Sequence, residues 1–144
     1  MTDIQIYIKT SCETCLLISE LLGELHEREG VEIINQEETP IPGLEDAFLD
    51  ADLERSFKAK IEAVPTVILN PEKANEVRLQ GWVRHEWIEA FGDFAHEHLP
   101  HFKPGCASKT LDPGRLEQLQ AEFEPGRIQS RRLAFNDVDD IEVG

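Results

Sequence analysis

The chain has 144 residues, of which 29 are acidic and 14 are basic, so its formal net charge is −15. This length fits one domain with an apolar core, and the hydrophobic fraction of 40% is well above that of disordered chains. The acidic balance excludes nucleic acid and anionic membrane surfaces as expected partners, because binding to either requires a basic surface.

The first 34 residues predict a strand, a helix and a second strand. Apolar side chains alternate over Ile4–Ile8, as in a half-buried strand. An apolar stripe at helical spacing predicts a helix over residues 12–29, which Gly30 ends, and residues 31–34 form the next strand. This order is typical of a parallel β-α-β unit.

The middle of the chain predicts one more helix, a hairpin and a third helix. An acidic loop over residues 35–43 precedes a helix over 44–62, in which apolar residues recur every four positions. Pro65 opens a short apolar strand, a loop over 70–75 joins it to a strand over 76–80, and a helix follows over 84–98.

Pro100 marks an expected boundary between a domain over residues 1–100 and a C-terminal extension over 101–144. The extension predicts irregular chain over 101–113, a short helix over 115–123 and a strand over 127–135. No apolar run approaches the ~20 residues of a membrane span. Without a signal-peptide pattern after Met1, we expect a cytoplasmic protein.

Two of the three cysteines, Cys12 and Cys15, form a C-x-x-C motif between the first strand and the first helix. A thiolate at a helix start is stabilised by free N–H groups, so the pKa of Cys12 falls from ~8.5 toward neutrality. Cys15 lies three residues further on the same helix face. Cys12 can then attack a disulfide, and Cys15 can displace the product from the mixed disulfide.

The element order, with Cys12-Glu13-Thr14-Cys15 and Val64-Pro65-Thr66, resembles the thioredoxin/glutaredoxin superfamily over residues 3–99. The resemblance implies an α/β, thioredoxin-like fold: a mixed four-stranded sheet flanked by helices, with a C-terminal extension. It implies that Cys12 is the nucleophile, Cys15 the resolving thiol and Pro65 a cis proline. Val64, Pro65 and Thr66 would bind an extended substrate strand, and Lys9 resembles the lysine with which glutaredoxins contact glutathione.

Several residues keep two interpretations. Cys106 is a third redox thiol or an ordinary loop cysteine, and Lys9 is a substrate contact or a surface lysine. Trp82 and Trp87 line a groove or pack in the core. A zinc site would need Cys106 with His96, His98 or His101 beside the cysteine pair.

The function predicted is a thiol–disulfide oxidoreductase with catalytic Cys12 and Cys15, and no metal or other cofactor is expected. Its partners would be a protein or small-molecule disulfide and a reductase or other thiol donor. The negative field favours neutral or basic protein substrates. The alternatives are a non-enzymatic thioredoxin-fold interaction module, docking a larger protein partner through the extension, or the N-terminal domain of a larger multidomain protein.

Overall fold

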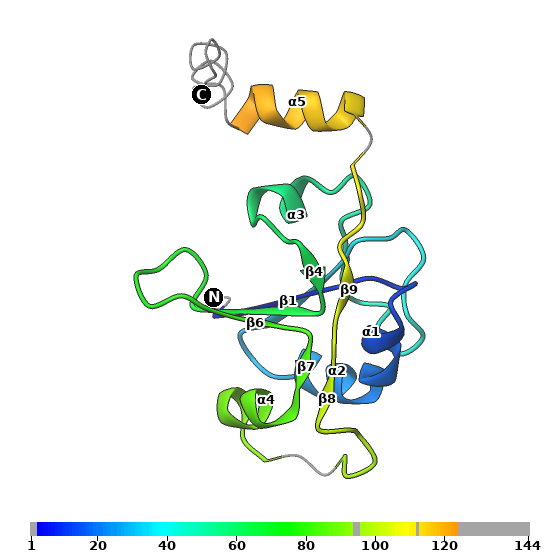
Figure 1. Cartoon of the computed structure of the whole chain (residues 1–144), viewed down its shortest axis with the longest axis vertical. Helices are drawn as coiled ribbons and strands as arrows, with labels where there is room; N and C mark the ends of the chain where they lie inside the picture. Colours follow the sequence, from blue (N-terminus) through cyan, green and yellow to red (C-terminus); the bar gives the residue numbers. More distant parts are fainter. Residues whose placement is uncertain (1–2, 94–95, 112, 124–144) are drawn as a thin grey trace. The chain divides into compact units, whose positions relative to one another are not determined.

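The computed structural model describes residues 3–93, 96–111 and 113–123. The chain divides into one compact unit that ends at Lys109 and a second that begins at Thr110 (Figure 1). Residues 101–109 therefore belong to the same unit as the sheet. None of the helices in the described ranges is long and apolar enough to cross a membrane.

The described residues form nine strands and five helices. The strands are β1 (Ile4–Ile8), β2 (Val31–Asn35), β3 (Phe48–Leu49), β4 (Ala63–Val64), β5 (Thr66–Leu69), β6 (Val77–Gln80), β7 (Trp82–Val83), β8 (Phe102–Lys103) and β9 (Cys106–Ala107). The helices are α1 (Glu13–Leu17), α2 (Ser19–His26), α3 (Glu54–Lys58), α4 (Arg84–Phe91) and α5 (Pro113–Phe123).

The main sheet is mixed and has the order β3-β2-β1-β5-β6. β1 and β2 are parallel, which confirms the β-α-β unit, and β5 and β6 form the expected antiparallel hairpin. The prediction of four strands was wrong. The fifth strand is β3, which pairs in parallel with the end of β2 where the sequence predicted a helix.

The core lies against the face of β1 that carries Ile6 and Ile8, which are fully buried. Apolar side chains of α1, α2 and α4 belong to the same core cluster. The opposite face carries Gln5 and Tyr7, and α3 lines that side. Trp82 and Trp87 are both fully buried with ring centroids 5.1 Å apart, so they pack in the core.

The first predicted helix is two helices. α1 ends at Leu17 and α2 begins at Ser19, with Ile18 between them in a non-helical conformation. The apolar stripe is nevertheless preserved, because Ile18, Leu21 and Leu22 are all buried.

The helix predicted over residues 44–62 was wrong, and only Glu54–Lys58 is helical. Asp50 sets the start of this helix: its carboxylate accepts hydrogen bonds from the backbone N–H groups of Arg55 and Ser56, at 3.1 and 2.8 Å. Leu53 precedes the helix in a left-handed conformation. The spacing of apolar residues was misleading, because Leu49 is 38% exposed and belongs to β3.

The helix predicted over 84–98 ends at Phe91, because Gly92 takes a φ of 88° that other residues rarely adopt. The segment predicted to be irregular contains β8 and β9. In the second unit, α5 begins at Pro113 and covers the helix predicted over 115–123. The strand predicted over 127–135 lies outside the described residues.

Candidate functional site

Cys12 is the N-cap residue of α1, at the end of the loop that follows β1. Its backbone is extended and its carbonyl accepts the first helical hydrogen bond, from Leu16 N–H at 3.0 Å. Its Sγ accepts a hydrogen bond from the backbone N–H of Cys15 at 3.2 Å. The C-x-x-C spacing therefore lets a helical N–H group donate to the first sulfur, just as such a group donates to the side-chain oxygen of an ordinary N-cap residue.

The pKa of the Cys12 thiol is lowered to about 5. The largest cause is a side-chain hydrogen bond with Cys15, while burial acts in the opposite direction. A side-chain hydrogen bond with Cys106 and the backbone N–H groups of Cys15 and Thr14 lower the pKa further. At neutral pH Cys12 is therefore a thiolate, the form that attacks a disulfide.

The pKa of Cys15 is raised, in the opposite direction. Burial is the largest cause, and the hydrogen bond and the negative charge of Cys12 add to it. The pair thus holds one negative charge, on Cys12, and one proton, on Cys15. This asymmetry is what a nucleophilic thiol and a buried resolving thiol require.

β4 supplies the other side of the Cys12 sulfur. As a thiol, Cys12 donates to the Val64 carbonyl oxygen across 3.5 Å. The Val64–Pro65 peptide bond is cis, which confirms that prediction. Thr66 begins β5, is buried, and donates from Oγ1 to the Ala63 carbonyl oxygen at 2.6 Å. The structure therefore brings Val64 to Cys12, and Pro65 and Thr66 follow directly in the chain.

Another segment of this chain pairs with the edge of β4 at which a substrate strand was expected. Residues 100–109, which we call the strap, carry β8 and β9 along this side of the unit (Figure 1). β9 pairs antiparallel with β4, so that Val64 is opposite Cys106 and Ala63 is opposite Ala107. β8 pairs antiparallel with β7. The expected position of a substrate strand thus holds residues of this protein.

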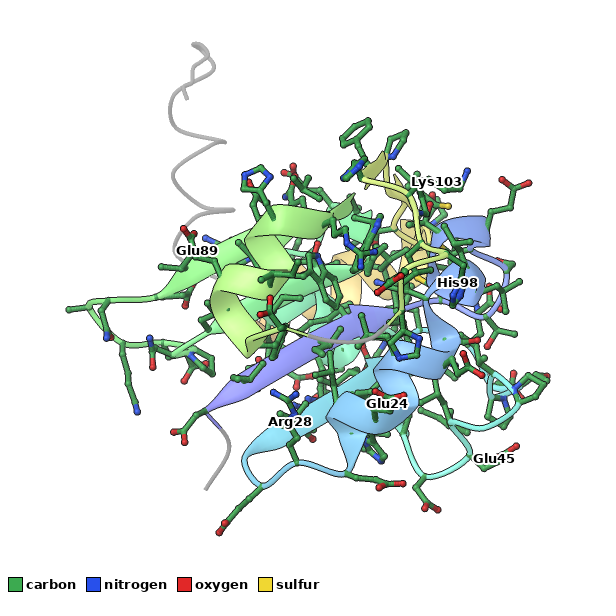
Figure 2. The ribbon with its side chains drawn as sticks, turned by 90° about the horizontal axis from the view of Figure 1, so that it is seen from below. Glu24, Arg28, Glu45, Glu89, His98 and Lys103 are labelled. Carbon is green, nitrogen blue, oxygen red and sulfur yellow. The ribbon has the colours of Figure 1, made fainter. Side chains whose placement is uncertain are left out.

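Side chains around the cysteine motif tie the strap down. Lys9 Nζ donates to the Ala107 carbonyl oxygen at 2.8 Å, and Thr14 Oγ1 donates to the Pro104 carbonyl oxygen at 2.7 Å. Lys103, labelled in Figure 2, lies 3.6 Å from the carboxylate of Glu13. In this structure Lys9, expected to be a substrate contact or a surface lysine, therefore binds the strap.

Cys106 meets the cysteine pair through this pairing. It is partly exposed, whereas Cys12 and Cys15 are both 0% exposed. The sequence predicted it either as a third redox thiol or as a loop cysteine, and its position opposite Val64 follows only from the β4–β9 register. The glycine before it was the available signal, because a strand that packs closely against another backbone needs a residue without a side chain.

Two of the histidines considered for a zinc site, His96 and His98, lie together with a glutamate. In the described part of the chain, the ligand atoms of Glu20, His96 and His98 lie within 4.8 Å of one another. His96 Nε2 also lies 2.9 Å from the carboxylate of Glu24 on α2 (Figure 2 labels Glu24 and His98). This group joins histidines to glutamates and includes neither Cys12 nor Cys106, so it differs from the cysteine–histidine site considered as an alternative.

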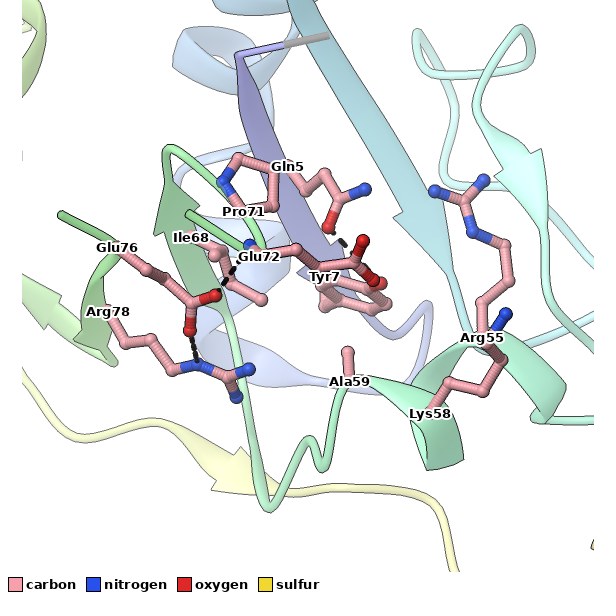
Figure 3. Close-up of a pocket in the computed structure, with 10 residues that line it drawn as sticks. All are labelled: Gln5, Tyr7, Arg55, Lys58, Ala59, Ile68, Pro71, Glu72, Glu76 and Arg78. Atoms are coloured by element: carbon pink, nitrogen blue, oxygen red, sulfur yellow. Dashed lines mark hydrogen bonds and ion pairs between the residues drawn. The ribbon is translucent and has the colours of Figure 1, made fainter. Parts of the chain in front are cut away.

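A pocket of about 260 Å³ opens on the other face of the sheet (Figure 3). Tyr7 lies at its base, and the Glu76–Arg78 ion pair, at 2.9 Å, lies on one side. Burial raises the pKa of Tyr7. None of the residues that line it is a cysteine, a serine or a histidine.

Comparisons with family models, with curated proteins and with solved structures find no match for this chain.

Proposed function

We propose that the protein is a thiol–disulfide oxidoreductase in which Cys12 is the nucleophile and Cys15 is the resolving thiol. The observation that carries the proposal is the 3.2 Å hydrogen bond from Cys15 N–H to Cys12 Sγ, in a pair where the pKa of Cys12 is about 5 and that of Cys15 is raised. Cys12 can therefore attack a disulfide as a thiolate, while Cys15 stays protonated until it resolves the mixed disulfide.

The reaction has two exchange steps. The Cys12 thiolate attacks one sulfur of a substrate disulfide, forms a mixed disulfide and releases the first product thiolate. Cys15 then loses its proton and attacks Cys12 Sγ, which releases the second product and leaves a Cys12–Cys15 disulfide. The substrate gains two electrons, and an external thiol donor or reductase restores the dithiol.

The fold proposed for this chemistry is thioredoxin-like. The support is the order β2-β1-β5-β6 within the main sheet, with β1 and β2 parallel and β5 and β6 antiparallel to their neighbours. The cysteine motif follows β1, and Pro65 immediately precedes β5. These are the positions in which the sequence resemblance places the motif and the proline.

The burial of both sulfurs favours a second candidate, a non-enzymatic interaction module. Cys12 and Cys15 are 0% exposed beneath the strap, as structural cysteines often are. A lowered pKa at Cys12 has no role in such a module, which is why we place the enzymatic candidate first.

Turnover of cystamine, a small cationic disulfide, by the protein in the presence of excess dithiothreitol separates these candidates. We expect wild-type turnover above the background and none from Cys12→Ser. In a separate reaction of reduced Cys15→Ser with cystamine, without dithiothreitol, we expect a trapped mixed disulfide on Cys12 or its exchange product. Ser11 lies next to the motif, and its hydroxyl donates a hydrogen bond to the carboxylate of Glu37. Ser11→Ala is therefore the matched control and should keep activity. Background-level turnover by the wild type supports the interaction module.

The redox potential of the pair then gives the direction of exchange. A value near ~−270 mV indicates a reductant and one near ~−120 mV an oxidant.

A further inference from the structure

The three cysteines of the chain meet at one end of β4. Cys12 Sγ lies 3.5 Å from the Val64 carbonyl oxygen, and Cys106 is the residue paired with Val64 in the β4–β9 ladder. Cys106 is also among the causes that lower the pKa of Cys12. The strand pairing therefore places a third thiol beside the thiol that we propose as the nucleophile.

Exposure separates these thiols. Cys12 and Cys15 are 0% exposed, whereas Cys106 is partly exposed. Thiol–disulfide exchange depends on access to the attacking sulfur. With the strap in place, a disulfide outside the protein therefore reaches Cys106 before it reaches Cys12.

The strap that carries Cys106 is closely fitted to the unit. A Cβ built on Gly105 would lie 2.7 Å from the Val64 carbonyl oxygen, closer than a real Cβ approaches other atoms. Gln36, which is fully buried, donates from Nε2 to Ser108 Oγ at 2.8 Å and accepts from the backbone N–H of Lys109 at 2.9 Å. Ser108 N–H also donates to the Glu62 carbonyl oxygen at 3.0 Å. These contacts hold Cys106 in position beside Cys12.

We propose that Cys106 is a third redox thiol, which exchanges disulfides directly with Cys12 and connects the buried Cys12–Cys15 pair with disulfides outside the protein. This inference rests on the proposed oxidoreductase function. It differs from a function in which substrate binds to β4, because the strap already holds that edge.

Each step of the relay is a balanced exchange. Cys106 loses its proton and attacks an external disulfide, which yields a mixed disulfide on Cys106 and one free thiolate. The Cys12 thiolate attacks Cys106 Sγ, which releases the second external thiolate and forms a Cys12–Cys106 disulfide. Cys15 loses its proton and attacks Cys12 Sγ, so that Cys106 leaves as a thiolate and regains a proton. The external disulfide is reduced, and the Cys12–Cys15 pair is oxidised.

The Cys15→Ser variant tests whether the Cys12–Cys106 disulfide forms as an intermediate. After reaction of the reduced variant with one equivalent of cystamine and blocking of free thiols, trypsin should release residues 10–28 linked by a disulfide to residues 85–109. Cleavage after Lys103 is blocked by Pro104, so Cys106 stays within the second peptide. A stable cystamine adduct on Cys12, with Cys106 free, would overturn the relay.

The rate of disulfide formation tests whether the relay is used. We expect Cys106→Ser to slow formation of the Cys12–Cys15 disulfide by roughly tenfold or more, because the remaining thiols lack access. The matched control is Cys106→Ser with Ala107→Cys, which keeps an exposed thiol but points it to the other face of β9. This control should stay slow.

The outcomes separate the two proposals. If Cys106→Ser forms the Cys12–Cys15 disulfide as fast as the wild type or faster, the relay is wrong and the oxidoreductase function stands. If neither the wild type nor Cys106→Ser forms that disulfide with cystamine, although the variant melts at the same temperature as the wild type, the proposed function fails and the relay fails with it. Restoration of the rate by the Ala107→Cys control would also overturn the relay, since any surface thiol would then suffice.

Discussion

Gly81 and Gly105 pack backbone against backbone where the strap crosses the end of β6. A Cβ built on Gly81 would lie 2.9 Å from the Gly105 nitrogen, and a Cβ built on Gly105 would lie 3.3 Å from Gly81 Cα. Gly81 also has a φ of 74°, which residues with a side chain rarely adopt. The two glycines therefore allow the strap to lie directly on the segment that follows β6.

Gly105→Ala should push the strap away from β4. The added methyl group would meet the Val64 carbonyl oxygen at 2.7 Å, and neither backbone can move without breaking the β4–β9 pairing. We expect a loss of about 1–3 kcal/mol in the free energy of unfolding, measured by urea denaturation.

Gly23→Ala is the control for this prediction. Gly23 is inside α2, and a Cβ there would meet only the Gly43 carbonyl oxygen at 3.9 Å, an ordinary contact. Alanine should stabilise this helix by about 0.5–1 kcal/mol. Equal effects of the two substitutions would show that the strap does not lie against Val64 as described.

Cys12 should titrate far below an ordinary thiol. The ultraviolet absorbance of its thiolate, taken as the difference between wild type and Cys12→Ser, should appear in a step centred at about pH 5. Because the pKa is lowered, the thiolate persists at neutral pH and is lost only as the pH falls through this value. Absorbance detects it without a reagent, which matters because Cys12 is buried.

A comparison with Cys106→Ala tests whether Cys106 helps to lower the pKa of Cys12. The side-chain hydrogen bond of Cys106 lowers the pKa of Cys12, so its removal should shift the step to higher pH. A step near the ordinary thiol value of ~8.5 in the wild type would refute both the lowered pKa and the mechanism built on it.

Gln36 joins the strap to the sheet and to α3. Its side chain bonds Ser108 Oγ, the N–H of Lys109 and Ser56 Oγ, the last at 3.0 Å, and it is 0% exposed. Gln36→Met keeps the length of the side chain but leaves buried polar groups without this partner. We expect the free energy of unfolding to fall by about 1–3 kcal/mol.

Gln5→Met provides the matched comparison, because among the described residues the side chain of Gln5 accepts only a long bond of 3.5 Å from Tyr7. Its effect in the same urea experiment should be clearly smaller. If both substitutions cost the same, the Gln36 network does not stabilise the strap.

Glu32 and Arg55 form a two-bond ion pair between β2 and α3, with N···O distances of 2.6 and 2.8 Å. The hydrogen bonds from Arg55 lower the pKa of Glu32. A carboxylate whose pKa is lowered by folding stabilises the protein above the unfolded pKa and loses this contribution as pH falls through the folded pKa. Glu32→Gln should therefore destabilise the protein at pH 7, and its difference from wild type should narrow in acid.

Unfolding by urea at neutral and acidic pH measures this difference. Glu38→Gln, at an exposed glutamate, is the control and should follow the wild type at both values. A Glu32→Gln difference that stays constant or widens in acid would contradict the assigned direction of the pKa.

The sequence patterns that were read correctly are local ones. Alternation over β1, the glycine after α2 and the loop between β5 and β6 each act within a few residues, so the four strands β1, β2, β5 and β6 could be predicted. The false helix over residues 44–62 shows the limit of spacing alone. Asp50 fixes the start of α3 through hydrogen bonds to Arg55 and Ser56, and no apolar period reports such a contact.

The strap could not be predicted for a different reason. β8 and β9 have two residues each, too few to show any period, and their partners β7 and β4 lie elsewhere in the sequence. The C-x-x-C motif identified Cys12 and Cys15, but the position of Cys106 beside Val64 depends on the register of β9 against β4. Gly105 signals a close approach to another backbone, but it does not specify which strand approaches or in which register.

The strap is synthesised late, and this has a consequence for the newly made chain. Cys12 emerges from the ribosome early, while Cys106, which lies beside it, is synthesised only after the whole sheet. Contacts between residues so far apart in the chain form slowly, because the intervening loop must first be closed. During that interval Cys12 and Cys15 are not covered by the strap, so these thiols of a nascent chain are open to mixed disulfides until the strap docks.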